Sequence, residues 1–322
     1  VSNVLNRPEH VTPELVARVS ASIDTLGFVR NRAASKLAAG VSDTVGVILV
    51  DLSNSYFTDM VKGAERYAAE AGKILVIGNS DIDENRQRSY LRYFEEEQVS
   101  GILVAPLNGV LTGQARTSMR QPLVILDAAS QRHDHCAVST NNVVAGRLAA
   151  QHLLDLGRRR LAFAGGPVGR SRALADRLLG AEEAVAAVPG ATLEYLPSDG
   201  VQVADGRLVG DLLATRPADQ LPEGIVAAAD LLALGIMQVL SRSTRARFPE
   251  DVALVACDDN RMAYDNVVPI STVDLPGLAM GETGMRLLLD ELTNQGVHEH
   301  KHVVLDPTLT ARESTLGRRT PG

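Results

Sequence analysis

The sequence has no tryptophan, two cysteines and only 3% aromatic residues among 322. No apolar run approaches the ~20 residues needed to cross a membrane, and we find no secretory signal. Two isolated cysteines cannot form a disulfide framework, so Cys136 and Cys257 are expected to be core thiols. These absences predict a cytoplasmic protein without a membrane partner.

Charge is unevenly distributed along the chain. The net charge is −7, but residues 1–41 contain five Lys or Arg against three acidic residues. A basic end on an acidic body suggests a polyanion as partner. A solvated helix surface explains the same charges, and on charge alone it is the preferred interpretation.

From Val45 onward, strand-like and helix-like segments alternate, in a chain that is 45% hydrophobic. The predicted strands are residues 45–50, 74–78, 101–105, 122–126, 160–164, 192–196, 224–228 and 252–257. The predicted helices are residues 57–71, 85–98, 143–156, 172–188, 203–215, 231–240 and 278–294. This is a doubly wound α/β pattern too long for one six-stranded sheet, and such sheets bind ligands beyond the carboxyl ends of their strands.

The first forty residues predict helices instead. Thr12 is an N-cap candidate, with Pro13 in the first turn and Glu14 at the positive end of the helix dipole. Gly27 is expected to end this helix. After it, Asn31 is an N-cap candidate for a second short helix.

Several stretches resemble the lactose repressor family of bacterial transcription regulators. They are VSNVLN, HVTPELVARVSASIDTLGFVRNRAASKL, AAADLLALG and VALVACDDN. The resemblance covers essentially the whole chain. It implies a helix-turn-helix headpiece that lacks its first helix, a hinge helix, and two Rossmann-like subdomains similar to periplasmic binding proteins.

The resemblance also implies domain boundaries. Residues 1–41 would form the truncated headpiece and hinge helix, and 42–322 the effector-binding and dimerisation domain. Within that domain, the N subdomain would hold about 44–141 and 273–299, and the C subdomain about 142–272 and 300–314. The chain would cross between them near Asn141, Thr272 and Glu299.

For the headpiece, the resemblance implies a set of DNA contacts. Asn3 would face adenine in the major groove, Leu37 would wedge into the minor groove, and other positions would contact phosphates. The predicted DNA-binding residues are Ser2, Asn3, Asn6, Thr12, Asn31 and Leu37. The partner would be a palindromic operator bound by a homodimer, with weak or absent binding for a chain without the first helix. Leu37 is otherwise explained as a core residue of a short amphipathic helix.

In the α/β body, candidate effector-binding residues come just after strands. Asn54, Tyr56 and Phe57 follow the first strand, where an aromatic ring can stack on a sugar or a base. Phe57 fits equally well as an inward-packing residue. Asp127, after the fourth strand, would lie near the cleft floor by the resemblance.

The remaining candidates depend on the resemblance more directly. Asn141 matches a ligand-contacting position, and Arg170 and Arg177 match arginines of the family's GP loop. Asp258 matches a carboxylate that would accept from two sugar hydroxyls, although capping of the helix near Asn260 is an alternative. The predicted effector-binding residues are Tyr56, Phe57, Asn141, Arg170, Arg177 and Asp258. Asp230 is expected to cap the helix that follows it.

We find no motif for catalysis, for a nucleotide or for a cofactor. His298, His300 and His302 alternate in HEHKH and would suit a metal, but a polar loop before the VVLD strand is preferred, and no metal site is predicted. The predicted function is a DNA-binding transcription regulator, a repressor controlled by a small molecule such as a sugar, and not an enzyme. The alternative is a sugar-binding receptor-like protein without DNA activity.

Overall fold

The structure is a computed structural model that describes residues 3–4, 10–27, 42–109, 111, 120–130, 134–242, 246–294 and 296–318. The chain divides into two compact units, Val1–Ser42 and Asp43–Gly322. Among the described residues, no helix combines the length and the apolar character needed to cross a bilayer.

The described part of the first unit is helical. Helix α2 spans Pro13–Leu26, with Thr12 at the N-cap position and Gly27 in the left-handed conformation at φ 58°. The sequence therefore predicted both ends correctly, although the Thr12 side chain makes no capping hydrogen bond. None of the residues of α2 is buried, and Leu26 is 79% exposed.

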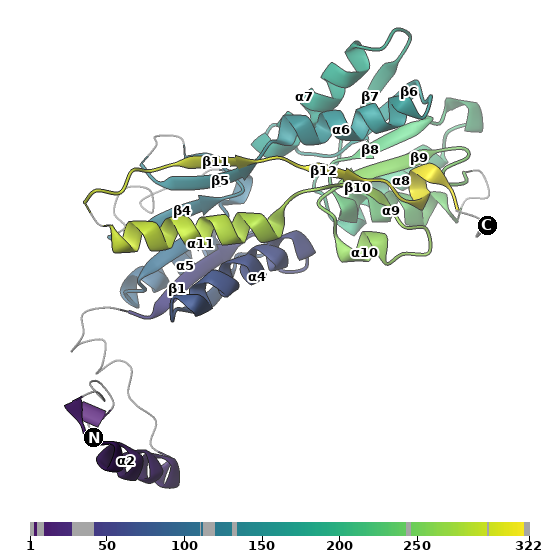
Figure 1. Cartoon of the computed structure of the whole chain (residues 1–322). Helices are drawn as coiled ribbons and strands as arrows, with labels where there is room; N and C mark the ends of the chain where they lie inside the picture. The colour runs from purple at the N-terminus through teal and green to yellow at the C-terminus, as the bar shows by residue number, and fades with distance from the viewer. Residues whose placement is uncertain are drawn as a thin grey trace. The chain divides into compact units, whose positions relative to one another are not determined.

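The second unit contains two six-stranded sheets (Figure 1). The first has the order β11-β5-β4-β3-β1-β2, and all its pairs are parallel. Its strands are β1 (Thr44–Leu49), β2 (Ile74–Asn79), β3 (Gly101–Val104), β4 (Leu123–Leu126), β5 (Cys136–Thr140) and β11 (His302–Leu305).

Helices cover both faces of the first sheet because its central strands are apolar on both sides. Val47 and Leu49 of β1 pack in the cluster that includes residues of α4 (Ser55–Glu70) and α11 (Gly277–Thr293). Ile48 packs on the opposite face with residues of α5 (Glu84–Glu96). A short 3₁₀ turn, η2, spans Leu107–Gly109.

The second sheet has the order β12-β10-β9-β8-β6-β7 and is parallel except for β12, which runs antiparallel to β10. Its strands are β6 (Arg160–Ala164), β7 (Thr192–Leu196), β8 (Gly224–Ala227), β9 (Ala253–Cys257), β10 (Ser271–Asp274) and β12 (Thr308–Thr310). Its helices are α6 (Asn142–Asp155), α7 (Arg172–Ala186), α8 (Val203–Ala214), α9 (Asp230–Leu240), α10 (Arg261–Tyr264) and α12 (Glu313–Leu316), with the 3₁₀ turn η4 (Ala218–Gln220).

The predicted fold of two Rossmann-like subdomains is confirmed, and every predicted strand and helix of the body is present within two residues. The crossing predicted near Thr272 lies two residues before the end of β10 at Asp274, after which the chain returns to the first sheet. The crossing near Glu299 is misplaced because β11 pairs with β5, and the chain leaves the first sheet between Leu305 and Thr308.

The character of the edge strands explains the misplaced crossing. In β11, exposed and half-buried residues alternate, and the strand begins with His302, so it lacks the long apolar run that marks a central strand. Strands β10 and β12 are only four and three residues long. Figure 1 shows β11 continuing into β12 as one extended stretch that links the two sheets.

Candidate functional site

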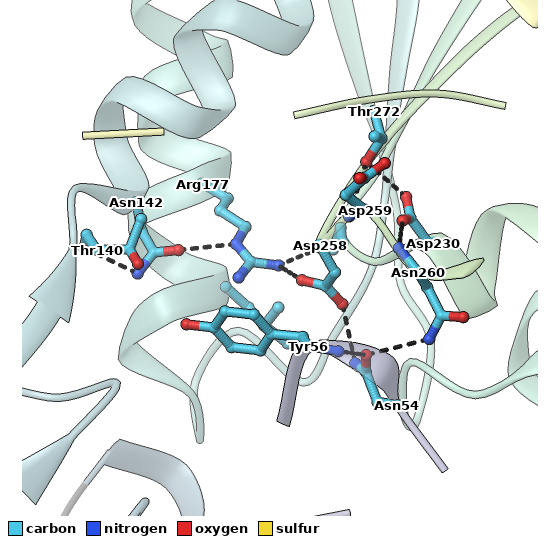
Figure 2. A network of polar contacts seen from close by, with 12 residues as sticks. Asn54, Tyr56, Thr140, Asn142, Arg177, Asp230, Asp258, Asp259, Asn260 and Thr272 are labelled. Carbon is cyan, nitrogen blue, oxygen red and sulfur yellow. Dashed lines mark hydrogen bonds and ion pairs between the residues drawn. The ribbon is translucent and has the colours of Figure 1, made fainter. Parts of the chain in front are cut away.

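Polar side chains from both sheets meet at the carboxyl ends of their strands (Figure 2). Asn54 follows β1 in the first sheet, and its Nδ2 donates to Oδ2 of Asp258, which follows β9 in the second, at 3.1 Å. Asn260 Nδ2 donates to Oδ1 of the same Asn54, also at 3.1 Å. The two halves of the second unit therefore build one site, as expected for α/β sheets.

Arg177, from α7, lies at the centre of this site and is only 5% exposed. Its Nε donates to Asn142 Oδ1 at 2.8 Å, and one terminal nitrogen donates to the carbonyl oxygen of Ala228 at 2.5 Å and to Asp258 Oδ1 at 3.2 Å. Burial disfavours the charged guanidinium, but the neighbouring groups, Asp258 foremost, raise the pKa of Arg177 above its ordinary value. The guanidinium therefore stays charged, with its orientation set by three partners.

Asp258 is held in an unusual backbone conformation. It has φ 114° and Asp259 has φ 59°, both in the region that L-residues rarely adopt. The buried Asp230 holds the turn in place, because its carboxylate accepts from the Asn260 N–H at 2.5 Å and from the Thr272 hydroxyl at 2.8 Å. Such strain persists only where the surroundings impose it, and it is concentrated at binding sites.

Burial dominates the ionisation of Asp258 and of its neighbour Asp230, the first residue of α9. It raises the pKa of Asp258, and Arg177 and Asn54 offset only part of that effect. Burial also raises the pKa of Asp230 well above its usual range, with the Asp258 charge adding to it. A negative charge at this turn is therefore unfavourable, and the positive charge of Arg177 offsets part of its cost.

A second polar group lies on the first-sheet side of the site. The Tyr56 hydroxyl donates to Asp127 Oδ1 at 2.8 Å and lies 3.6 Å from the sulfur of Met280. Burial raises the pKa of Asp127 to about 6. Nearby, the buried Thr140 side chain lies close enough to the Tyr56 hydroxyl to lower the pKa of Tyr56, which burial raises.

The raised pKa of Asp127 predicts a pH dependence of stability. Between the ordinary value of 3.8 and about 6, the native state holds a proton that the unfolded chain releases, so this group's contribution to stability is lost as pH rises through that window. Asp127→Asn is neutral throughout and should gain stability relative to the parent as pH rises from 4 to 7. Urea denaturation of both proteins across this range measures the difference, and a constant difference would contradict the prediction.

Further contacts between the halves surround this centre. Gln202 Nε2 donates to Asp51 Oδ2 at 3.1 Å, and Arg261 forms an ion pair with Asp59 at 3.0 Å while its N–H donates to Ser55 Oγ at 3.1 Å. All the residues that the first sheet's half contributes to these contacts lie between Asp51 and Asp59. A ligand bound beside Arg177 that shifted one half against the other would change all of these contacts.

Comparisons with known proteins agree with this arrangement. A family model described as a periplasmic binding protein-like domain matches residues 150–315, just over half of the chain. The ribose operon repressor of Escherichia coli is 26% identical over 329 residues, which are 98% of this chain and 94% of that protein. The HTH-type transcriptional repressor PurR of Aliivibrio fischeri is 25% identical, with 99% and 94% covered. The chain belongs to the lactose repressor family of transcription regulators.

Solved structures of this family share the fold. The complex of the transcriptional regulator CelR with cellobiose is 28% identical, with a TM-score of 0.71 over 97% of this chain and 94% of that one. The lac repressor dimer bound to operator and the anti-inducer ONPF superposes with a TM-score of 0.81 over 98% and 94% of the two chains, at 22% identity. That second likeness concerns the fold.

For this repressor-family chain, the structure brings together only part of the predicted effector set. Tyr56, Arg177 and Asp258 lie in the network, whereas Phe57 is half-buried against the core beside Tyr56. Arg170 is exposed, and its side chain has no hydrogen bond or ion pair among the described residues.

Three helix starts differ in detail from the prediction. Asn141 uses its side chain to cap α6 by accepting from the Val144 N–H at 3.2 Å. Asp230 does not cap its own helix, since its carboxylate is occupied by Asn260 and Thr272. Asn260 caps α10, which removes capping as the explanation for Asp258.

Of the predicted DNA-binding residues, the structure describes Asn3, which is helical and exposed, and Thr12. The others lie outside the described residues: Ser2, Asn6, Asn31 and Leu37. Asn142 belongs to the site although only its neighbour Asn141 was predicted from the sequence. For Asn54, the only signal in the sequence is its position just after β1.

Proposed function

We propose that this protein is a transcription repressor whose affinity for operator DNA is set by a small polyhydroxylated effector, a sugar, held between the two sheets. One observation carries the proposal: Asn54 and Asp258, from opposite halves of the fold, meet directly beside the buried Arg177. An effector that binds there contacts both halves at once and favours one arrangement of them.

The chemistry of the site favours a sugar. Carboxylate and amide oxygens accept hydrogen bonds from hydroxyls, and the site offers Asp258, Asp127 and Asn54. Among the described residues, the second terminal nitrogen of Arg177 has no hydrogen-bond partner and is a donor for a ring or hydroxyl oxygen. The names of related proteins fit as well, since they include a ribose operon repressor and a regulator in complex with cellobiose.

The effector-binding residues in this proposal are Tyr56, Asn54, Asn142, Arg177 and Asp258, with Phe57 and Arg170 as less direct candidates. On the DNA side, the proposed contacts are Ser2, Asn3, Asn6, Thr12, Asn31 and Leu37, in a cytoplasmic homodimer bound to a palindromic operator. Effector binding changes operator affinity by the difference in its binding energy for the two arrangements.

Asp258→Asn should weaken effector binding strongly. The substitution keeps the shape of the side chain but leaves Arg177 without its counter-ion and removes a two-lone-pair anionic acceptor. A thermal-shift screen of pentoses, hexoses, disaccharides and nucleobases first identifies a compound that binds the parent protein. Calorimetry then measures its affinity for the parent and for Asp258→Asn. We expect the variant to bind about 100-fold more weakly, or by ~2.7 kcal/mol, typical of truncated charged hydrogen-bonding partners. The exposed Asp211→Asn is the matched control and should bind as the parent does.

The DNA function is tested separately. Duplexes selected from a random pool by the protein are used in fluorescence anisotropy, with and without the sugar. A sugar-dependent change in affinity that disappears in Asp258→Asn supports the proposal. Sugar binding without selection of any duplex would instead identify a receptor-like protein without DNA activity, and equal sugar binding by Asp258→Asn would remove Asp258 from the site.

A further inference from the structure

Four side chains that can bind a metal ion meet near the amino end of strand β5, at the end of the first sheet away from the proposed effector site. Cys136 begins β5, Glu291 lies in the last turn of α11, and His298 and His300 lie between α11 and β11. One ligand atom from each lies within 4.8 Å of all the others. Cys136 and His298 are 162 residues apart in the sequence, so the fold creates this group.

We propose that Cys136, Glu291, His298 and His300 form a binding site for a thiophilic divalent cation, Zn²⁺. One thiolate, two imidazoles and one carboxylate are all ligands that zinc accepts in a four-coordinate site. Bonds of about 2.0–2.3 Å in a tetrahedron place neighbouring ligand atoms about 3.3–3.6 Å apart. The Cys136 Sγ to His298 Nε2 distance is 3.2 Å and that from His298 Nε2 to Glu291 Oε2 is 4.0 Å, so small side-chain rotations complete the geometry.

The surroundings of His298 are those of a metal ligand. Its side chain is only 4% exposed, and its Nδ1 lies 2.8 Å from Asp290 Oδ2. A carboxylate on the far ring nitrogen fixes the tautomer and leaves Nε2 as the free donor atom. Nε2 is the atom that faces both Cys136 and Glu291.

Without a cation, the cluster leaves a polar atom unsatisfied. Glu291 Oε2 is buried and has no hydrogen-bond partner among the described residues. A divalent cation in the cluster would satisfy that oxygen. Its binding forms a metal–thiolate bond at Cys136 and releases the thiol proton to solvent. An ordinary Cys–His contact would leave the glutamate oxygen unexplained.

This site is separate from the proposed effector site. Cys136 and Thr140 are the two ends of β5, which is about 13 Å long at ~3.3 Å per residue. The ion would join the segment after α11 to the start of β5. The start of β5 lies at the amino ends of the parallel strands, as does Thr44, the first residue of β1. Its expected effect is to stabilise the native state, by an amount that grows with the logarithm of the free Zn²⁺ concentration above the dissociation constant.

The test uses the full chain, without an affinity tag and after treatment with a chelator. Titration with Zn²⁺ against a chromophoric chelator should give one site per chain and a rise in melting temperature. Co²⁺ in place of Zn²⁺ should produce the visible absorption of tetrahedral cobalt and a near-ultraviolet thiolate charge-transfer band. Cys136→Ser should lose that charge-transfer band.

Variants locate the site. His300 is exposed, so His300→Gln should fold normally and lose at least about 100-fold in Zn²⁺ affinity, whereas Asp290→Asn should lose about 10–100-fold. His302→Gln is the matched control, because His302 Nε2 lies 2.7 Å from Ser139 Oγ and is outside the cluster, and its affinity should not change. Absence of stoichiometric binding, or equal affinity in His300→Gln and His302→Gln, would overturn the proposal.

Discussion

Replacing Arg177 with methionine should lower the free energy of unfolding by about 3–5 kcal/mol, the usual cost of leaving one partner of a buried ion pair uncompensated. Methionine fills much of the same volume but cannot donate to Asp258, to Asn142 or to the Ala228 carbonyl oxygen. Effector binding should disappear as well, because the orientation of Asp258 depends on this guanidinium. Chemical denaturation and calorimetry with the sugar measure the two effects.

A control on the same helix separates burial from charge. Arg172, at the start of α7, pairs with Asp176, but its side chain is 81% exposed. Arg172→Met should therefore cost no more than about 1 kcal/mol. The double variant Arg177→Met/Asp258→Asn removes both charges and should recover part of the lost stability. Equal losses in Arg177→Met and Arg172→Met would show that the buried pair contributes nothing special.

Arg177 and Asp258 were predicted from the family resemblance, and local signals in the sequence agree with both positions. Asp258 follows an apolar strand, where parallel sheets present ligand-binding loops. Arg177 stands at helical spacing from Leu174, Ala181 and Ala184, which are all buried in α7, so the pattern places a cation on the inward face. The exposed Arg170, seven residues earlier, carries no such pattern.

Other parts were beyond local signals. Asp230 was expected to cap its own helix, yet its carboxylate binds the Asn260 N–H thirty residues away. Which donors an aspartate finds depends on how strands β9 and β10 are placed next to α9. In the same way, His298 looks like part of a polar loop until β5 brings Cys136 within 3.2 Å of it. The crossing predicted near Glu299 was misplaced for the related reason that the exposed strand β11 lacks an apolar run.

Gly281→Ala should have the other large effect, because helices α4 and α11 touch through their backbones. A Cβ atom at Gly281 would lie closer than 3.0 Å to the carbonyl oxygen of Met60, and one at Gly63 would meet the carbonyl oxygen of Leu278 equally closely. Backbone atoms cannot move aside as a flexible side chain can. We expect a loss of about 3 kcal/mol or more in the free energy of unfolding, at the upper end of overpacking costs.

Gly281→Ala should also weaken effector binding. Helix α4 carries Tyr56 in its first turn, and Met280, next to Gly281, lies 3.6 Å from the Tyr56 hydroxyl and accepts from the Asp127 N–H at 3.2 Å. Forcing the helices apart moves this group relative to Arg177, so effector affinity should fall together with stability. Gly169→Ala is the control, since a Cβ there meets nothing within 4 Å, and both properties should stay unchanged. Equal free energies of unfolding for Gly281→Ala and Gly169→Ala in urea would contradict this prediction. They would show that α4 and α11 can separate at little cost.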